Sequence, residues 1–141
     1  MASITCQFVR PDRLLFEGDI ANMVLVTPAG ELGVWPGHAP EIVALGNGVV
    51  RLTNLPEHGG DKVKVIVSGG YAEITPTQVI ILADHARRSD DIEPDVVEAT
   101  RGKAMAKRDA LPEGDGRRAY YDNKIVWCDM LLKHASGEHD A

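Results

Sequence analysis

The chain has 141 residues, of which 44% are hydrophobic, so it is long enough to bury a core of its own. This composition excludes a disordered tail and a minimal disulfide scaffold, and the length allows one domain with an appendage. Acidic side chains outnumber basic ones by 21 to 15, giving a net charge of -6. That charge disfavours a protein that binds the phosphate backbone, so we expect no nucleic acid partner.

The cysteines and the first residues of the chain bear on the cellular setting. Cys6 and Cys128 lie near opposite ends of the chain without a CxxC motif, which favours a reducing compartment. The first residues lack the basic and apolar stretches of a signal peptide, and no Arg-rich transit peptide is present. No apolar run approaches the length of about 18 residues that spans a bilayer. We therefore expect a protein that stays where it is made and reaches a membrane only through a partner.

Residues 1–88 have the composition of an all-β unit, since they hold ten of the fourteen glycines and six of the eight prolines. Apolar residues alternate with polar ones, as Ile4, Cys6 and Phe8 do, and turn residues such as Gly69 and Gly70 separate the segments. We predict strands near residues 4–8, 20–27, 48–53, 62–67, 71–75 and 78–83. The expected architecture is a two-sheet β-sandwich or flattened barrel.

After residue 88 the sequence changes to a helical pattern. Acidic residues followed by Pro94 are typical of a helix start, where free amides and the helix dipole favour them. A first helix is predicted over residues 94–110, a turn over 111–116 and a second helix over 117–135. Residues 89–141 thus form an antiparallel helical hairpin, and its polar end from about residue 136 is expected to fray.

The second predicted helix carries a broad apolar stripe that needs a partner. The stripe, interrupted by Lys124, comprises Tyr120, Tyr121, Ile125, Trp127, Cys128, Leu131 and Leu132, with Asp122, Asp129 and Lys133 expected on the opposite side. The first helix has few large apolar residues and contains Gly102, which costs about 1 kcal/mol relative to alanine. It therefore covers only part of the stripe. Either the stripe packs on the sandwich, or it docks on other subunits.

The residues that carry chemistry form no recognisable catalytic or metal-binding motif. The histidines include no HxH, HExxH or i, i+4 pair, and no serine lies in a G-x-S-x-G elbow. Ser68 is interpreted as the end of a strand that enters a turn, and Asp84 with His85 as turn residues. We therefore expect no catalytic residue, no metal and no cofactor.

The densest cluster of proline and glycine lies in residues 27–40. We expect this cluster to form a rigid pair of loops at one end of the sandwich. Such loops present side chains from a stiff scaffold, here Glu31, Trp35 and His38, as binding sites commonly do. A purely structural role is the alternative.

Residues 30–40, with the sequence GELGVWPGHAP, closely resemble the signature of the epsilon subunit of F-type ATP synthases. Further matches follow in the family's order: GVVR at 48–51, VSGGYAEI at 67–74, VIILADHA at 79–86 and the pair DI at 91–92. The resemblance covers both halves of the chain, over nearly its full length.

The resemblance implies a noncatalytic subunit of the central stalk, in the rotor of a bacterial proton-translocating ATP synthase. One face of the sandwich would meet the gamma subunit, and the loop at its base would meet the ring of c subunits. The matching residues for the c-ring contact are Glu31, Leu32, Gly33, Trp35 and His38. The implied location is peripheral, at the cytoplasmic face of the plasma membrane, with the complex alone providing membrane attachment.

The family's helical hairpin is a regulatory element. Folded on the sandwich it permits turnover, and extended along gamma it inserts in the catalytic head of alpha and beta subunits and blocks ATP hydrolysis. The residues that the resemblance assigns to it are Arg117, Arg118, Tyr121, Lys124, Ile125, Trp127, Cys128, Leu132 and Lys133. The four basic side chains among them suit an acidic surface on the head, although Asp122 and Asp129 weaken that argument and a solvated face is the alternative.

One departure from the family bears on nucleotide binding. Members that bind ATP on the hairpin open the first helix with Ile-Asp or Leu-Asp, followed after two residues by Arg-Ala. Here Glu93 replaces the aspartate, Val96 the arginine and Val97 the alanine. Because a valine cannot pair with phosphate, the sequence predicts no tight ATP site in the isolated chain.

A second hypothesis stays open: a small-molecule-binding β-sandwich that happens to share the loop motif. The rotor hypothesis predicts a stable complex with a gamma-like subunit. The alternative predicts a monomer whose loop variants lose a ligand.

Overall fold

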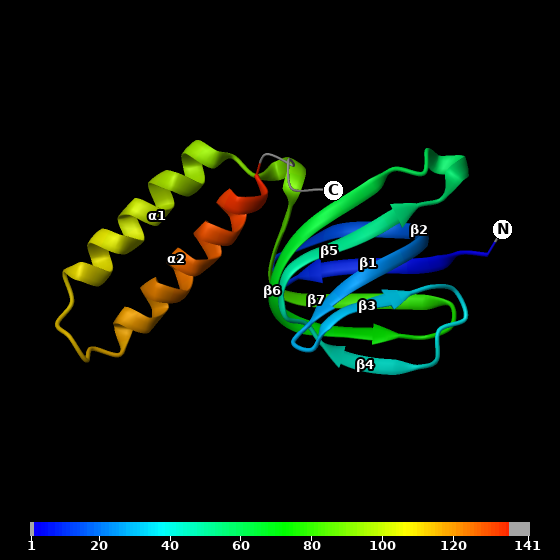
Figure 1. Ribbon diagram of the computed structural model, residues 1–141, viewed down its shortest axis with the longest axis horizontal. Helices are drawn as coiled ribbons and strands as arrows, with labels where there is room; N and C mark the ends of the chain where they lie inside the picture. The colour runs from blue at the N-terminus through cyan, green and yellow to red at the C-terminus, as the bar shows by residue number, and fades with distance from the viewer. Residues whose placement is uncertain (1, 136–141) are drawn as a thin grey trace. The chain divides into compact units, whose positions relative to one another are not determined.

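A computed structural model describes residues 2–135, in two compact units that meet between Arg88 and Ser89 (Figure 1). The first unit contains β1 (Ile4–Arg10), β2 (Arg13–Thr27), β3 (Gly30–Val34), β4 (Glu41–Ala44), β5 (Asn47–Asn54), the 3-10 helix η1 (Pro56–His58), β6 (Lys62–Ile74) and β7 (Gln78–Arg88). The second contains η2 (Ser89–Asp91), α1 (Pro94–Asp109) and α2 (Arg117–His134). The expected fraying from residue 136 lies outside the described residues.

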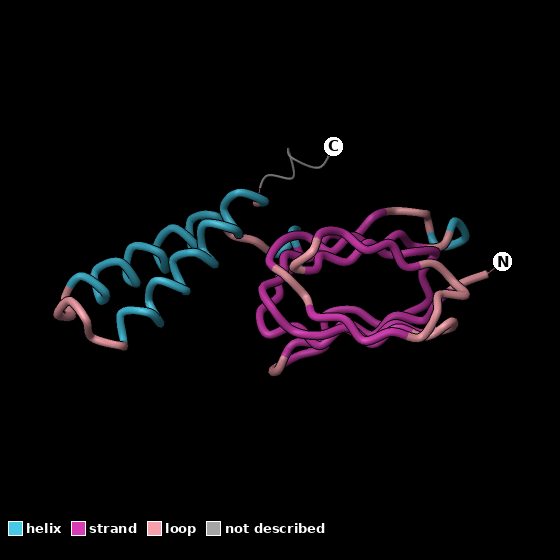
Figure 2. The backbone as a smooth tube through the Cα atoms, turned by 60° about the horizontal axis from the view of Figure 1, so that its bottom comes forward, coloured by secondary structure: helices cyan, strands magenta, loops and turns pink. Residues whose placement is uncertain are grey.

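The strands of the first unit form two layers that close into a flattened barrel (Figure 2). Hydrogen bonds join them in the order β1-β7-β6-β5-β2-β3, with β1 also paired to β2 and β4 paired to β6. The ring closes because β2 and β6 are long enough to serve both layers. In β6, residues 62–68 pair with β5 and residues 71–74 pair with β4. The predicted β-sandwich followed by a helical hairpin is confirmed.

The core of the sandwich consists of the residues that alternate inward along each strand. Ile4, Cys6 and Phe8 are fully buried, as the alternation predicts, and Val65 and Val67 of β6 belong to the same cluster. Burial also raises the pKa of the Cys6 thiol to about 12, because a thiolate there would lose its hydration. Cys6 therefore stays protonated and unreactive while the sandwich is folded.

The prediction of a turn at Gly69 and Gly70 is wrong, because β6 continues through both residues. Their φ values of 73° and 122° lie in the region that favours glycine. A Cβ on Gly70 would overlap the carbonyl oxygen of Leu82, so the backbone of β7 passes unusually close to β6 here. The glycine pair therefore bends a continuous strand as it passes from one layer to the other.

The interpretation of Ser68 and of Asp84 with His85 as turn residues is also wrong. Ser68 lies within β6, paired to Asn47 on one side and His85 on the other, and its hydroxyl donates to the Asn47 side chain at 2.9 Å. Asp84 and His85 lie within β7. Pairing with two neighbouring strands outweighs the turn-like composition of these segments.

Strand β3 lies inside the proline- and glycine-rich region that the sequence assigned to loops, and β4 follows directly after that region. β3 pairs with β2, and β4 pairs with the second half of β6. These strands have only five and four residues, too few for an alternating pattern to stand out between turns. Among the described strands, β3 and β4 each have a single partner, so both are edge strands.

The hairpin helices agree with the predicted boundaries to within one residue at each end. The buried residues are Val97 and Ala104 of α1, and Ile125, Cys128 and Leu131 of α2. The expected stripe is only partly correct, because Tyr120 is 62% exposed. Asp122 and Asp129 are not on a side opposite to the helix contact, since both form ion pairs with arginines of α1. The face of α2 that contacts α1 thus includes polar residues, Asp122 and Asp129, as well as the buried apolar ones.

We predict that Gly102→Ala raises the free energy of unfolding of the hairpin by about 0.5–1 kcal/mol, because alanine loses less backbone entropy in a helix. No atom lies within 4 Å of a Cβ built on Gly102, so the added methyl group meets no obstacle. Urea denaturation followed by far-UV circular dichroism measures the effect. Gly70→Ala is the contrasting variant and should destabilise the sandwich by more than about 1 kcal/mol. A neutral or destabilising Gly102→Ala would contradict the placement of this residue.

Candidate functional site

The signature segment, residues 30–40, does not form one pair of loops at one end of the sandwich. A tight turn precedes it, in which the Thr27 hydroxyl donates to the carbonyl oxygen of Gly30 at 2.7 Å and accepts from the amide of Ala29 at 3.2 Å. Strand β3 follows, and residues 35–40 then form a loop at the far end of that strand. At about 3.3 Å per residue, β3 separates the turn from the loop by about 13 Å.

Glu31, at the start of β3, is held by an ion pair with Arg51 of β5. The Nη1 atom of Arg51 lies 2.9 Å from Oε2 of Glu31, and the two side chains are 36% and 57% exposed. Residues Val24 and Val26 of β2 lie between them in the register, so the pair spans a strand. The sequence match included Arg51, but nothing in the sequence indicated this contact.

Trp35 begins the loop and is 54% exposed. A Cβ on Gly33 would overlap the indole ring, which shows that the ring packs over the backbone of β3 at this glycine. The loop is fixed at two further points: the amide of His38 donates to the carbonyl oxygen of Trp35 at 3.2 Å, and the amide of Gly37 donates to that of Pro76 at 2.8 Å. The loop is therefore anchored to the turn between β6 and β7.

His38 is oriented by its own loop. Its Nδ1 donates to the carbonyl oxygen of Ala39 at 2.7 Å, which leaves Nε2 directed at Glu41, 4.0 Å from Oε1. His38 and Glu31 do not meet, because they lie on opposite ends of β3. Glu41, at the start of β4, is the carboxylate that approaches His38, and the sequence did not single it out.

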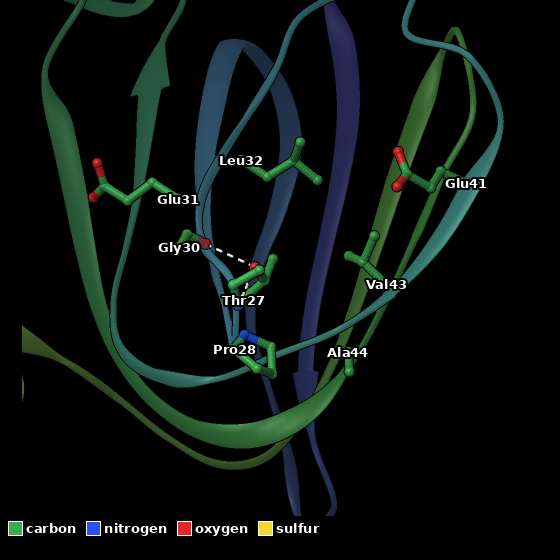
Figure 3. A pocket seen from close by; sticks show the side chains of 9 residues that line it. Thr27, Pro28, Gly30, Glu31, Leu32, Glu41, Val43 and Ala44 are labelled. Carbon is green, nitrogen blue, oxygen red and sulfur yellow. Dashed lines mark hydrogen bonds between the residues drawn. The ribbon is translucent and has the colours of Figure 1, made fainter.

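A shallow pocket of about 420 Å³ opens between the edge strands β3 and β4 (Figure 3). Its lining residues are Thr27, Pro28, Ala29, Gly30, Glu31, Leu32, Glu41, Val43 and Ala44. Figure 3 shows Leu32 and Val43 between the carboxylates of Glu31 and Glu41. We call this region, together with the loop of residues 35–40, the β3–β4 seam. It combines an apolar floor with carboxylates at its rim, so it suits a polar protein surface better than an enclosed ligand.

A second exposed surface lies on the outside of the layer that contains β4, β6, β7, β1 and β2. Tyr71 of β6 pairs with Leu82 of β7, Leu82 with Val9 of β1, and Val9 with Leu14 of β2. Paired residues point to the same side of a sheet, so these side chains form one row. Ile42 of β4 lies in the adjacent row of that side. The exposed fractions of Leu14, Ile42, Tyr71 and Leu82 are 50%, 71%, 63% and 56%.

We call Leu14, Ile42, Tyr71 and Leu82 the apolar face. The sequence did not identify the apolar face. The alternation along β1 that buries Cys6 and Phe8 does place Val9 on the opposite side of the sheet, which is the side of the apolar face. Large apolar side chains gathered on one exposed sheet surface are typical of protein–protein interfaces.

The basic residues of α2 fall into two classes. Arg117 forms an ion pair with Asp115 in the preceding turn, at 2.7 Å, which lowers the pKa of Asp115 to about 2. Arg118 donates to the carbonyl oxygens of Arg108 and Leu111, at 2.9 and 2.8 Å. The second class, formed by two lysines, is exposed: Lys124 lies 5.8 Å from the centre of the Tyr120 ring, and Lys133 lies in the last turn of α2.

Two ion pairs cross from α1 to α2. The Nε atom of Arg101 lies 2.6 Å from Oδ1 of Asp129, and Nη1 of Arg108 lies 3.1 Å from Oδ1 of Asp122. Hydrogen bonds from Arg108 to Asp122 and to its neighbour Asp109 raise the pKa of Arg108 above its ordinary value. The sequence offered no signal for these pairs, because they depend on how the helices align.

The remaining predicted hairpin residues divide by burial. Ile125 and Cys128 are buried, whereas Tyr121, Trp127 and Leu132 are half-buried. At the start of α1, Val97 is buried, Val96 is 54% exposed, and Glu93 precedes the helix without a side-chain capping bond. The absence of a tight ATP site stays a prediction.

No helix within residues 2–135 is both long enough and apolar enough to cross a membrane. The same part of the chain contains no group of three or more His, Cys, Asp or Glu side chains arranged to hold a metal ion.

Residues 3–89 match the family described as ATP synthase, Delta/Epsilon chain, beta-sandwich domain. Among curated proteins, the ATP synthase epsilon chain of Bacillus pumilus is 34% identical over 119 residues, which cover 84% of this chain and 88% of that protein. The ATP synthase epsilon chain of Anoxybacillus flavithermus is 40% identical over 108 residues, covering 77% of this chain and 76% of that protein.

The fold has a counterpart in a solved complex. A chain in the structure of the Euglena gracilis mitochondrial ATP synthase, OSCP/F1/c-ring, superposes with a TM-score of 0.70 at 24% identity, covering 94% of this chain and 81% of that one. Because the relatives match across both units, chance sharing of one loop motif does not explain the likeness. The alternative of an unrelated small-molecule-binding sandwich is thereby discarded, and the chain belongs to the epsilon-chain family of F-type ATP synthases.

Proposed function

We propose that this chain is a noncatalytic rotor subunit that links the gamma subunit to the c ring of a proton-translocating ATP synthase. Its apolar face binds gamma, and its β3–β4 seam binds the c ring. The observation that carries the proposal is the presence of these two exposed surfaces, different in chemistry, on one closed sandwich. A protein that joins two partners needs such a pair of surfaces.

The chemistry of each surface favours its assigned partner. Gamma turns with this subunit as one body, and permanent interfaces are rich in large apolar side chains, like those of the apolar face. The c ring presents polar loops in this family, and the β3–β4 seam offers the carboxylates of Glu31 and Glu41 and the exposed ring of Trp35. Polar rims of this kind give register and specificity more than affinity.

The sandwich also suits a part that transmits torque. Its strands are hydrogen-bonded around a closed ring, and its core residues are fully buried. A close-packed interior resists shear, so rotation passes through it with little deformation. Attachment through the c ring places the subunit at the cytoplasmic face of the bacterial plasma membrane, as a peripheral component.

The hairpin acts, in this proposal, as a brake on ATP hydrolysis when it extends toward the alpha and beta subunits. Lys124 and Lys133 are exposed basic side chains of α2, and we take them as the candidates for contact with an acidic surface on the head. Arg117 and Arg118 are committed to partners within the hairpin in the structure described here.

Loss of the seam's charge should weaken the contact with the c ring. We predict that Glu31→Arg reduces the affinity of the gamma–epsilon complex for isolated c rings by about five- to tenfold, because reversal of a rim charge removes its attraction and adds repulsion. Microscale thermophoresis measures the change. Glu57→Arg, at an exposed site in η1, is the matched control and should bind as the unmodified chain does. Equal binding of both variants would contradict the assignment of the seam.

Truncation on the apolar face should weaken gamma binding. We predict that Leu82→Ser lowers the affinity for gamma by about 5- to 30-fold, which corresponds to about 1–2 kcal/mol for a large apolar side chain that becomes buried. Val126→Ser removes a side chain of similar exposure from α2 and is the control, 54% against 56% exposed. If Leu82→Ser and Val126→Ser co-purify with gamma equally well, the apolar face is not the gamma site.

Removal of the hairpin should separate assembly from regulation. We predict that a chain ending at Asp91 assembles and supports ATP synthesis, because both proposed binding surfaces lie before residue 89, while ATP hydrolysis by membranes increases several-fold. Paired assays of synthesis and hydrolysis on inverted vesicles check this. Unchanged hydrolysis would show that the hairpin is not a brake in this enzyme.

A further inference from the structure

The apolar contact between the two helices is thin. The side chains of α1 that are buried are Val97 and Ala104, both small, against Ile125, Cys128 and Leu131 of α2. Small side chains fill little volume and fix the alignment of two helices poorly, because a shift along the axis costs few contacts. Something other than apolar packing must therefore set the register of the hairpin.

The two ion pairs between the helices supply that register. Arg101 and Arg108 are seven residues apart on α1, and Asp122 and Asp129 are seven residues apart on α2. Seven residues are about two helical turns, or about 10.5 Å, so both pairs lie on one side of the hairpin. Because the helices are antiparallel, a single alignment satisfies both pairs, and a slip by one turn breaks both.

Arg118 adds a third link at the turn end of the hairpin. Its guanidinium is part-buried and donates to the carbonyl oxygen of Arg108, in the last turn of α1, and to that of Leu111, just beyond the end of the helix. The last carbonyl oxygens of a helix have no partner within the helix and carry the negative end of its dipole. A cation from α2 thus caps α1, and it can do so only while the helices lie side by side.

We propose that Arg118 and the pairs Arg101–Asp129 and Arg108–Asp122 form an electrostatic clasp that holds the hairpin closed in one register, so that ionic strength controls its opening. This inference deepens the proposed regulatory function, since it names the contacts that must break before α2 leaves α1. It also assigns Arg118, which the sequence directed to the catalytic head, to the closed state of the hairpin itself.

The size of the effect follows from the exposure of each link. Loss of one exposed ion pair increases the equilibrium constant for opening of the hairpin by about 1.4- to fivefold. Hydrogen bonds from a charged group to part-buried carbonyl oxygens contribute more, about tenfold. Salt screens exposed pairs, since the Debye length is about 10 Å at 0.1 M and about 3 Å at 1 M. Opening should therefore increase with salt in the unmodified chain.

The chain carries its own probe of this opening. Cys128 is 3% exposed on the buried side of α2, and Cys6 is fully buried in the sandwich. Alkylation of Cys128 by iodoacetamide, followed by mass spectrometry of the full chain, reports separation of the helices. Alkylation of Cys6 in the same sample reports unfolding of the sandwich, so the two thiols distinguish local opening from global unfolding.

The matched variants are Arg118→Gln and Arg117→Gln, which make the same substitution at neighbouring positions. Arg117 pairs only with Asp115, outside the two helices, among the contacts described for it. We expect Arg118→Gln to speed Cys128 alkylation about tenfold and Arg117→Gln to leave it unchanged, with Cys6 protected in both. Raising NaCl from about 0.1 M to about 1 M should speed alkylation in the unmodified chain, because it screens the two exposed ion pairs.

Exchanging the two charges of the Arg101–Asp129 pair distinguishes loss of the ion pair from general disruption of the helix. Arg101→Glu should speed Cys128 alkylation, and adding Asp129→Arg should restore protection by re-forming the pair with reversed charges. Equal alkylation of Arg118→Gln and Arg117→Gln, or no rescue by the exchange, would overturn the clasp. ATP hydrolysis by the assembled complex is measured separately. Faster alkylation without altered hydrolysis supports the clasp and contradicts the brake.

Discussion

The passage of two long strands from one layer of the sandwich to the other is the constraint on which the rest of this structure depends. β2 and β6 each serve both layers, and β6 makes the bend at Gly69 and Gly70, where the backbone of β7 comes too close for a side chain. This bend closes the ring of strands and leaves the short strands β3 and β4 at its edges. The two surfaces proposed as binding sites, the apolar face and the β3–β4 seam, are consequences of that closure.

The two units are stabilised by different kinds of interaction. The sandwich depends on apolar burial, with a core of fully buried side chains in a hydrogen-bonded ring. The hairpin buries only small side chains on α1 and has aligned charges between its helices, so its closure is weaker and sensitive to salt. This contrast suits the proposed roles, because a torque-bearing part must resist deformation and a regulatory part must change conformation at low cost.

Sequence reasoning succeeded where the signal was local and long. Helices α1 and α2 were placed to within one residue, because a proline, acidic residues and a glycine-rich turn mark their ends. It failed at Ser68, Gly69 and Gly70, where turn-like residues lie in a continuous strand. It also missed β3 and β4, whose few residues give no periodic pattern, and it placed Asp122 and Asp129 away from α1, although both contact it.

The sequence by itself determined the family, the order of a β unit and a helical hairpin, and the inward alternation of the core. Motifs and periodicity depend only on residues that are close together in the sequence, so they can be recognised without the fold. Only the tertiary structure decided which residues share a surface. Leu14, Ile42, Tyr71 and Leu82 come from four strands and gather through strand register. The ion pairs of α1 with α2 depend in the same way on helix alignment. Long-range pairing brings such residues together, and no local pattern encodes it.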